Sequence, residues 1–129
     1  MTTGQLEHVN ITVSDPQRSA DLVCDLFGWE IRWQGPSQLG GHSIHVGNPG
    51  NGSDYLVFYT NDKVIANNPQ FSKGEPLNHI GIIVDDLDAI EAKVIAAGLE
   101  PFSREKYDPG ERFYFFDWNR VEFEVVSYG

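Results

Sequence analysis

The residues best suited to chemistry are two histidines and two glutamates on the polar side of alternating strands. His8 and His79 each lie in a short segment in which apolar residues alternate with other types. Glu122 and Glu124 alternate in the same way with the apolar residues of the last predicted strand. Because every second side chain of a strand shares a face, the apolar residues predict a core face and these four the opposite face. Imidazole and carboxylate groups suit a divalent first-row metal, and a three-ligand site leaves positions open for a substrate.

The segments around the two histidines form an internal repeat. Residues 6–17 read LEHVNITVSDPQ, and residues 77–88 read LNHIGIIVDDLD. In each copy a strand precedes a helix and three more strand signals follow, so the order strand, helix, strand, strand, strand occurs twice. His8 and His79 hold the same place in the two copies. Neither copy can cover both faces of its own sheet, so pairing the copies predicts a cup lined by the non-core faces.

This pattern predicts one α+β domain, residues 1–129. It consists of two tandem βαβββ modules that form a cup-shaped mixed β-sheet, with one helix packed on each module. The first module covers about residues 5–60 and the second about residues 77–128. Residues 61–76 show no periodicity and are expected to be a connector.

Both predicted helices have recognisable ends. The first follows Ser14 and Asp15, which are candidate caps, runs to about residue 27, and ends at Gly28. The second follows the pair at residues 85–86, and Gly98 closes it. Capping side chains before a helix and glycine after it are the usual signals of helix boundaries.

Composition excludes several classes of protein. The net charge of the 129-residue chain is −10, whereas a nucleic-acid partner needs a basic surface. No apolar run approaches the roughly 18 residues that span a membrane. The first residues lack the features of a signal peptide, and the single cysteine, Cys24, excludes an internal disulfide, so we expect a cytoplasmic protein. Cys24 lies within the first predicted helix, where a small buried hydrophobe is a better interpretation than a catalytic thiol.

The chain resembles the vicinal oxygen chelate superfamily, which includes glyoxalase I, extradiol dioxygenases, fosfomycin-modifying thiol transferases and bleomycin-binding proteins. The likeness covers residues 5–128. It is carried by the paired strands with His8 and His79, by DLFGW at 25–29, and by FYFFDWNRVEFEV at 113–125. The last segment is similar to the ending DPDG-x-x-hydrophobic-E of that family.

This resemblance implies that Glu124 is a metal ligand, although Trp118 and Arg120 stand where the family ending usually has Pro and Gly. His8, His79 and Glu124 would then hold one divalent ion, for which Fe, Mn, Zn and Ni are all candidates. The site could be completed within one chain or across two. The family's twofold assembly, and the exposed sheet edges that each module leaves, predict a homodimer.

Tyr114 is one of the alternate residues of its strand that are predicted to face the cup. Tyrosines at the matching place in extradiol dioxygenases and fosfomycin enzymes imply that it contacts substrate, and a phenol can donate a proton or a hydrogen bond to an oxyanion. Packing within an aromatic strand is the alternative.

Only one of His42 and His45 can face the cup because their separation is odd. We interpret them as surface histidines, with an acid–base role for one as the alternative.

The glyoxalase I pattern requires a carboxylate on the last strand of the first module as a fourth ligand. Residues 54–60 carry no Asp or Glu in the middle of that strand, where Val57 or Tyr59 stands instead. We therefore do not expect classical glyoxalase I activity. The predicted function is a metal-dependent enzyme acting on a small oxygenated molecule, as a lyase, isomerase, dioxygenase or transferase.

The alternative is a metal-free protein that binds a small molecule or drug, as bleomycin-resistance proteins do. In that interpretation His8 and His79 are hydrogen-bonded residues of an empty cup. Aromatic residues would hold an aromatic or cationic ligand, helped by the acidic charge. The candidates for this role are Trp29, Trp33, Tyr55 and Trp118.

Overall fold

The computed structural model describes residues 3–37, 40–50, 54–67, 71, 74, 77–107 and 109–129. The chain divides into two compact units, Met1–Pro69 and Gln70–Gly129. Parts of the predicted connector, at 68–70, 72–73 and 75–76, lie outside the described residues.

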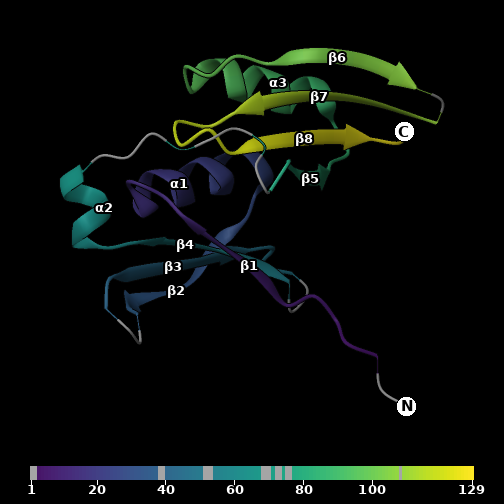
Figure 1. Ribbon diagram of the computed structural model, residues 1–129. Helices are drawn as coiled ribbons and strands as arrows, with labels where there is room; N and C mark the ends of the chain where they lie inside the picture. The colour runs from purple at the N-terminus through teal and green to yellow at the C-terminus, as the bar shows by residue number, and fades with distance from the viewer. Residues whose placement is uncertain are drawn as a thin grey trace. The chain divides into compact units, whose positions relative to one another are not determined.

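Unit 1 contains a four-stranded mixed sheet with the strand order β1-β4-β3-β2 (Figure 1). The pair β1–β4 is parallel, and the pairs β2–β3 and β3–β4 are antiparallel. Its elements are β1 (His8–Thr12), α1 (Pro16–Phe27), β2 (Glu30–Pro36), β3 (His42–Gly47), β4 (Tyr55–Thr60) and α2 (Asp62–Asn67). The predicted order βαβββ is confirmed, whereas α2 falls in the segment for which no helix was predicted.

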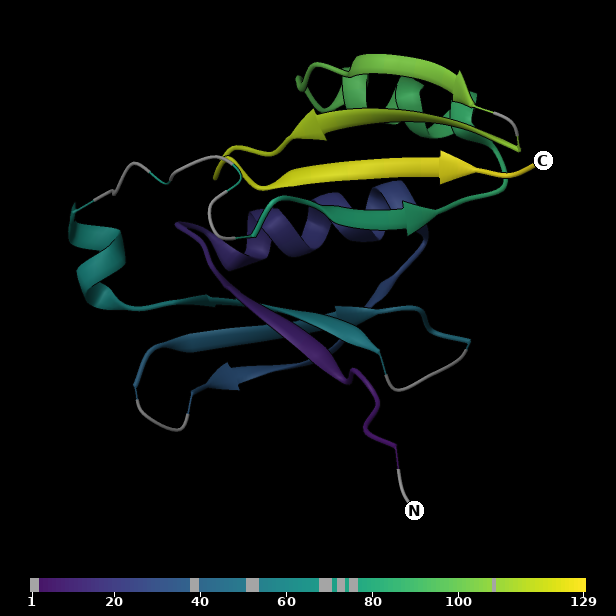
Figure 2. The same ribbon diagram turned by 45° about the vertical axis from the view of Figure 1, so that its right-hand side comes forward.

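Unit 2 repeats this topology, with the strand order β5-β8-β7-β6. The pair β5–β8 is parallel and the remaining pairs are antiparallel. Its elements are β5 (Ile80–Ile83), α3 (Leu87–Ala96), β6 (Phe102–Tyr107), β7 (Gly110–Phe116) and β8 (Glu122–Ser127). Figures 1 and 2 show α3 on one face of this sheet, where it packs on β7 and β8. The predicted α+β class with two βαβββ modules is therefore confirmed.

One sheet face of each unit carries the apolar residues. In unit 1, α1 packs on β3 and β4, and Ile44 and Phe58 on those strands are fully buried. In unit 2, Phe113 of β7 and Phe123 of β8 are fully buried, as is Val94 of α3. Because strand side chains alternate, burying these residues places their neighbours on the opposite sheet face, and the candidate site lies there.

The helix ends match the sequence signals. The side chain of Asp15 accepts a hydrogen bond from the backbone N–H of Arg18 at 3.2 Å, and Asp86 accepts one from Ala89 at 3.1 Å. Each carboxylate caps a helix N-terminus that would otherwise leave donors unsatisfied. Gly28 follows α1 with φ of 68°, a left-handed conformation that glycine adopts without steric cost.

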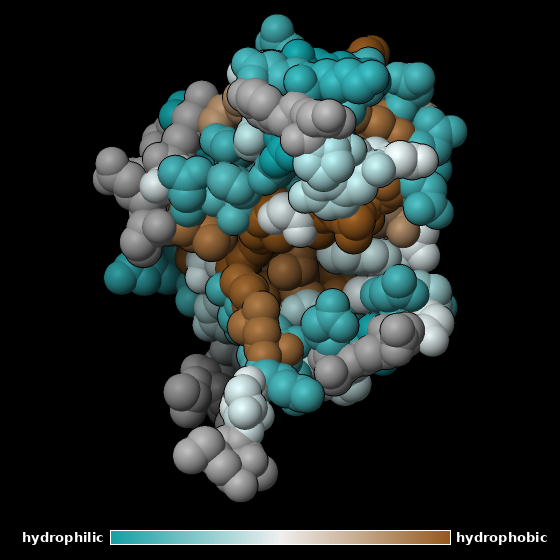
Figure 3. All heavy atoms as spheres, turned by 90° about the vertical axis from the view of Figure 1, so that its right-hand side faces the viewer, coloured by the Kyte–Doolittle hydropathy of each residue, from teal (hydrophilic) through white to brown (hydrophobic). Residues whose placement is uncertain are grey.

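The surface combines polar residues with several exposed apolar side chains (Figure 3). The most exposed of the large ones are Leu6, Ile83 and Ile95. No helix in the described part of the chain is long and apolar enough to cross a membrane.

Candidate functional site

The polar face of unit 2 brings together three predicted site residues. Phe123 and Val125 of β8 are fully buried, so Glu122 and Glu124 project from the opposite face, as predicted. Tyr114 of β7 is the cross-strand partner of Glu124. His79 immediately precedes β5, which pairs in parallel with β8.

His79 and Glu124 are in direct contact. Nε2 of His79 lies 3.1 Å from Oε1 of Glu124, and Oε2 of Glu122 lies 3.9 Å from Nδ1. Nδ1 also lies 2.8 Å from the side-chain oxygen of Asn78. Because an amide oxygen can only accept, Nδ1 must carry a proton, and in the neutral imidazole the lone pair is then on Nε2, facing the carboxylate.

Arg112 and Tyr114 complete the surroundings of Glu124. The guanidinium of Arg112 donates to Oε2 of Glu124 at 2.9 Å, which leaves Oε1 for His79. Burial, and then the negative charge of Glu124, raise the pKa of the Tyr114 phenol above its ordinary value. The raised pKa keeps Tyr114 protonated at neutral pH, and a hydrogen bond with the Glu124 carboxylate contributes to it. Its ring also meets the ring of His79 edge-on, with centroids 5.9 Å apart.

His8 lies in β1 of unit 1, on the face predicted for it. Its Nδ1 lies 3.0 Å from Oε1 of Glu7, the residue that precedes it. His79 has the same arrangement with Asn78, so in both units the preceding side chain provides an acceptor for Nδ1. Whether His8 and the residues of unit 2 bind one ion stays a prediction.

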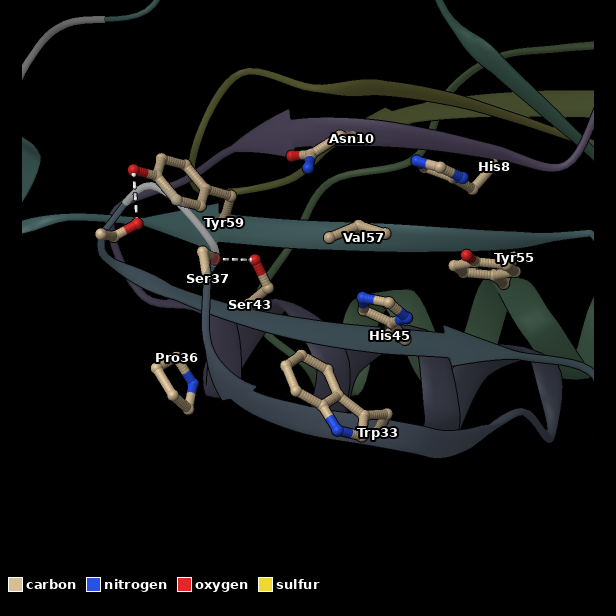
Figure 4. Close-up of a pocket in the computed structure, with 11 residues that line it drawn as sticks. His8, Asn10, Trp33, Pro36, Ser37, Ser43, His45, Tyr55, Val57 and Tyr59 are labelled. Atoms are coloured by element: carbon tan, nitrogen blue, oxygen red, sulfur yellow. Dashed lines mark hydrogen bonds between the residues drawn. The ribbon is translucent and has the colours of Figure 1, made fainter.

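A cavity of about 750 Å³ opens on the polar face of the unit 1 sheet (Figure 4). A row of rings crosses the sheet there, with one ring from each strand. His8 stacks on Tyr55 at 5.1 Å between centroids, and Tyr55 stacks on His45 at 5.1 Å. Trp33 meets His45 edge-on at 5.0 Å. Polar side chains of the same lining include Asn10, Ser37, Ser43 and Tyr59.

His45 is the site residue that sequence reasoning missed. His45 is half-buried in the cavity lining, whereas His42 is exposed and outside it, so His45 is the one of the two that lies on the polar face. The signal was available, because Ile44 and Val46 are apolar and alternate with Ser43 and His45. Burial, and then the proximity of His8, lower the pKa of His45 below its ordinary value.

The aromatic residues expected to enclose a ligand separate into two groups. Trp33 and Tyr55 line the cavity. Trp29 does not, and packs instead against Phe27 with centroids 5.2 Å apart. Trp118 follows β7 in unit 2 and is not part of this lining.

The strand register locates the place where glyoxalase I would have its fourth ligand. Gly81 of β5 pairs with Glu124, and Asn10, the repeat equivalent of Gly81, pairs with Val57. Val57 is therefore the unit 1 counterpart of Glu124. The sequence alone had left Val57 and Tyr59 as candidates for this position. A valine cannot bind a metal, so this position provides no ligand.

His79 and Glu124 are two of the three predicted ligands, and their donor types suit a divalent metal. Ligand atoms bound to one ion at about 2.1 Å lie roughly 3 Å apart when the bonds meet at right angles. The separation of 3.1 Å between His79 Nε2 and Glu124 Oε1 is close to that value and is equally that of an ordinary ion pair. Among the described residues, no group of three or more His, Cys, Asp or Glu side chains is placed to hold a metal ion.

Comparison with known proteins identifies the family. The profile of the Glyoxalase/Bleomycin resistance protein/Dioxygenase superfamily matches residues 5–125, which is nearly the whole chain. The chain belongs to this superfamily. No curated protein matches the sequence at a significant level.

Several solved structures share the fold. A glyoxylase/bleomycin resistance protein/dioxygenase domain from Frankia sp. EAN1pec has a TM-score of 0.81 and 20% identity, covering 99% of this chain and 100% of that one. TnmS3, an antibiotic-binding protein from Streptomyces sp. CB03234, has a TM-score of 0.75 and 18% identity, covering 100% and 99%. The fosfomycin resistance protein FosX from Listeria monocytogenes, in complex with Mn(II) and sulfate, has a TM-score of 0.74 and 15% identity, covering 98% and 93%. At these identities the likeness establishes the fold alone.

Proposed function

We propose that the protein is a metal-dependent enzyme that acts on a small oxygenated molecule. His8, His79 and Glu124 would hold one divalent ion, and Tyr114 would donate a proton or a hydrogen bond to the substrate. A metal bound there would polarise the substrate oxygens that coordinate it. The reaction class would be that of a lyase, isomerase, dioxygenase or transferase of this superfamily.

The contact between Nε2 of His79 and Oε1 of Glu124 supports this proposal most directly. Both atoms are of types that bind divalent metals, and an ion pair with a protonated His79 would give the same separation. Glu7 and Asn78 each engage Nδ1 of a histidine, which would leave Nε2 to bind the ion, and partners of this kind fix the ligating nitrogen in many metal sites. The manganese of the FosX complex is consistent with the choice of a divalent ion.

Elemental analysis of purified protein that has not met a chelator tests the proposal. We expect stoichiometric Fe, Mn, Zn or Ni in the wild type. In His8→Ala, His79→Ala and Glu124→Gln, metal affinity should fall by more than about a hundredfold, since loss of an outer partner alone costs about ten- to hundredfold. His42→Ala is the matched control and should retain the metal. A wild-type protein that binds none of the four metals would contradict the proposal.

The cavity of unit 1 supports a second candidate, a metal-free small-molecule-binding protein. All of its lining residues belong to unit 1, and its volume of about 750 Å³ is in the range of drug-sized sites. The fold likeness to TnmS3, an antibiotic-binding protein, is consistent with this candidate. Chelator-treated protein that binds a small molecule as tightly as untreated protein would favour it over the enzyme.

A further inference from the structure

Arg112 is a charged residue of the unit 2 polar face for which the proposed ligand set and Tyr114 provide no role. It lies on β7, and its guanidinium donates to Oε2 of Glu124 at 2.9 Å. Both side chains are largely shielded from solvent, since 21% of Arg112 and 14% of Glu124 is exposed. A hydrogen bond between two charged groups is about twice as strong as one between neutral groups, and partial burial limits its screening by salt. The contact therefore restrains the Glu124 carboxylate.

The strand register explains how Arg112 reaches this carboxylate. Tyr114 is directly opposite Glu124 in the antiparallel ladder, and Arg112 is opposite Val126. Arg112 is thus a diagonal neighbour of Glu124 on the same sheet face, a spacing of about 7–8 Å that long side chains can bridge. The two carboxylate oxygens have different partners, because Arg112 engages Oε2 whereas Oε1 lies 3.1 Å from Nε2 of His79.

The strand on the other side of Glu124 leaves room beside Oε1. Gly81 of β5 pairs with Glu124 in the parallel ladder. A Cβ atom at Gly81 would stand 3.9 Å from Oε1, and no other described atom beyond its chain neighbours would lie within 4 Å of it. One oxygen of Glu124 is therefore held by Arg112, and the other borders open space next to His79.

Unit 1 lacks both partners of this ion pair. Val57 holds the unit 1 place of Glu124, as shown above. In unit 1, Ser43 pairs with the residue two positions beyond Val57. In unit 2, Arg112 pairs with the residue two positions beyond Glu124, so Ser43 and Arg112 are equivalent positions of the repeat. The repeat thus has arginine where the inner strand carries a carboxylate, and serine where it carries valine, which connects the guanidinium with Glu124 rather than with the sheet.

We propose that Arg112 is the positioning residue of Glu124, which holds Oε2 and keeps Oε1 beside Nε2 of His79, where the proposed ion would bind. The inference rests on the proposed function and adds a residue that does not itself bind the ion. Outer partners that orient a ligand contribute about ten- to hundredfold to metal affinity. The positive charge of Arg112 acts in the opposite direction, because it repels a cation. Variants that separate the hydrogen bond from the charge are therefore required.

Zinc affinity is measured by competition with a chromophoric chelator in the wild type and in three variants of Arg112. Arg112→Lys retains a donor and the charge, Arg112→Gln retains a donor without the charge, and Arg112→Met retains neither. Arg104→Met is the matched control, because Arg104, on the neighbouring strand β6, donates instead to carboxylates of α3 and β7. Circular dichroism checks that all variants are folded.

We expect Arg112→Met to bind zinc at least about tenfold more weakly than Arg112→Gln, because these two variants share their charge and differ in the hydrogen bond. Arg112→Lys should remain within about tenfold of the wild type, and Arg104→Met should equal the wild type. Equal affinities of the Met and Gln variants of Arg112 would overturn the inference. A loss in Arg104→Met as large as that in Arg112→Met would also overturn it, because it would indicate general destabilisation.

Crystal structures of the metal-free proteins test the role of Arg112 separately from the proposed function. In the wild type and in Arg112→Gln, Oε1 of Glu124 should lie within hydrogen-bond distance of Nε2 of His79. In Arg112→Met the carboxylate should turn away from this nitrogen. A carboxylate that keeps its place in Arg112→Met would overturn the inference. If the wild type binds no zinc, these structures alone decide it.

Discussion

Single side chains decide which nitrogen of each histidine is available. Glu7 accepts from Nδ1 of His8 at 3.0 Å, and Asn78 accepts from Nδ1 of His79 at 2.8 Å. The acceptor is a carboxylate in one unit and an amide in the other. Both units therefore have an acceptor at the residue before the histidine, but only one of the two is charged. Engagement of Nδ1 leaves Nε2 as the nitrogen that would bind the proposed ion in both units.

Tyr114 provides a residue-scale prediction that separates an enzyme from a binding protein. If its phenol stabilises a transition state, Tyr114→Phe should lower turnover by about a hundredfold with little change in affinity. If the protein only binds its ligand, the same change should cost about 0.5–1.5 kcal/mol of binding free energy. Kinetics and calorimetry with a substrate found by screening diols, catechols, epoxides and hemithioacetals would measure both.

Tyr128→Phe is the matched control for this substitution, because Tyr128 is 53% exposed and lies beyond β8. It should leave turnover and affinity as in the wild type. Unchanged turnover in Tyr114→Phe would remove Tyr114 from the catalytic residues, whatever the metal content.

At the scale of elements, helix capping gives a stability prediction. The carboxylate of Asp86 accepts from the backbone N–H of Ala89, so Asp86→Ala should lower the free energy of unfolding by about 1 kcal/mol. The adjacent Asp85→Ala removes the same charge without removing the cap. Urea unfolding of the two variants should therefore differ, and equal destabilisation would show that the cap contributes nothing beyond charge.

The repeat made the elements predictable from sequence. Two copies of one pattern fixed the order of strands and helices, and Asp15, Asp86 and Gly28 marked helix ends because capping depends on local chemistry. The short helix α2 was missed, since six residues are too few for a periodic signal. Its start is instead marked by Asn61, whose side chain accepts from the backbone N–H of Val64 at 2.9 Å.

The site was only partly predictable, because strand register is a property of pairing. Alternation placed Glu124 and Tyr114 on the right face, but only the ladders show that Val57 is the counterpart of Glu124. The conformation of Arg120, in the turn between β7 and β8, could likewise not be predicted from the sequence. This residue has φ of 65°, a left-handed conformation, at the place where the family ending usually has glycine. Arg120 thus adopts the left-handed conformation that glycine favours, although it is not a glycine.

At the scale of the whole molecule, exposed sheet edges predict a homodimer. β1 and β2 are the edge strands of the unit 1 sheet, and β5 and β6 those of the unit 2 sheet. Ile83 of β5 is 68% exposed, and an apolar edge is usually covered. Light scattering at micromolar concentration should give twice the chain mass of 14.5 kDa.

Ile83→Lys should weaken this dimer, because a charge on an edge strand opposes pairing. Ile95→Lys is the matched control, since Ile95 is 60% exposed but belongs to a helix. A wild-type protein that is monomeric at all concentrations tested would rule out the homodimer.

The contact between Trp33 and His45 gives the cavity an optical signal of its own. The two ring centroids are 5.0 Å apart, and a protonated imidazole quenches indole fluorescence at such range. Because burial lowers the pKa of His45, the emission of Trp33 should stay constant above pH 7 and decrease only at more acidic pH. Subtracting the emission of Trp33→Phe from that of the wild type isolates this component from Trp29 and Trp118. The emission of Trp33 could thus report the protonation of His45 without a label. It could also report the binding of a ligand in the cavity.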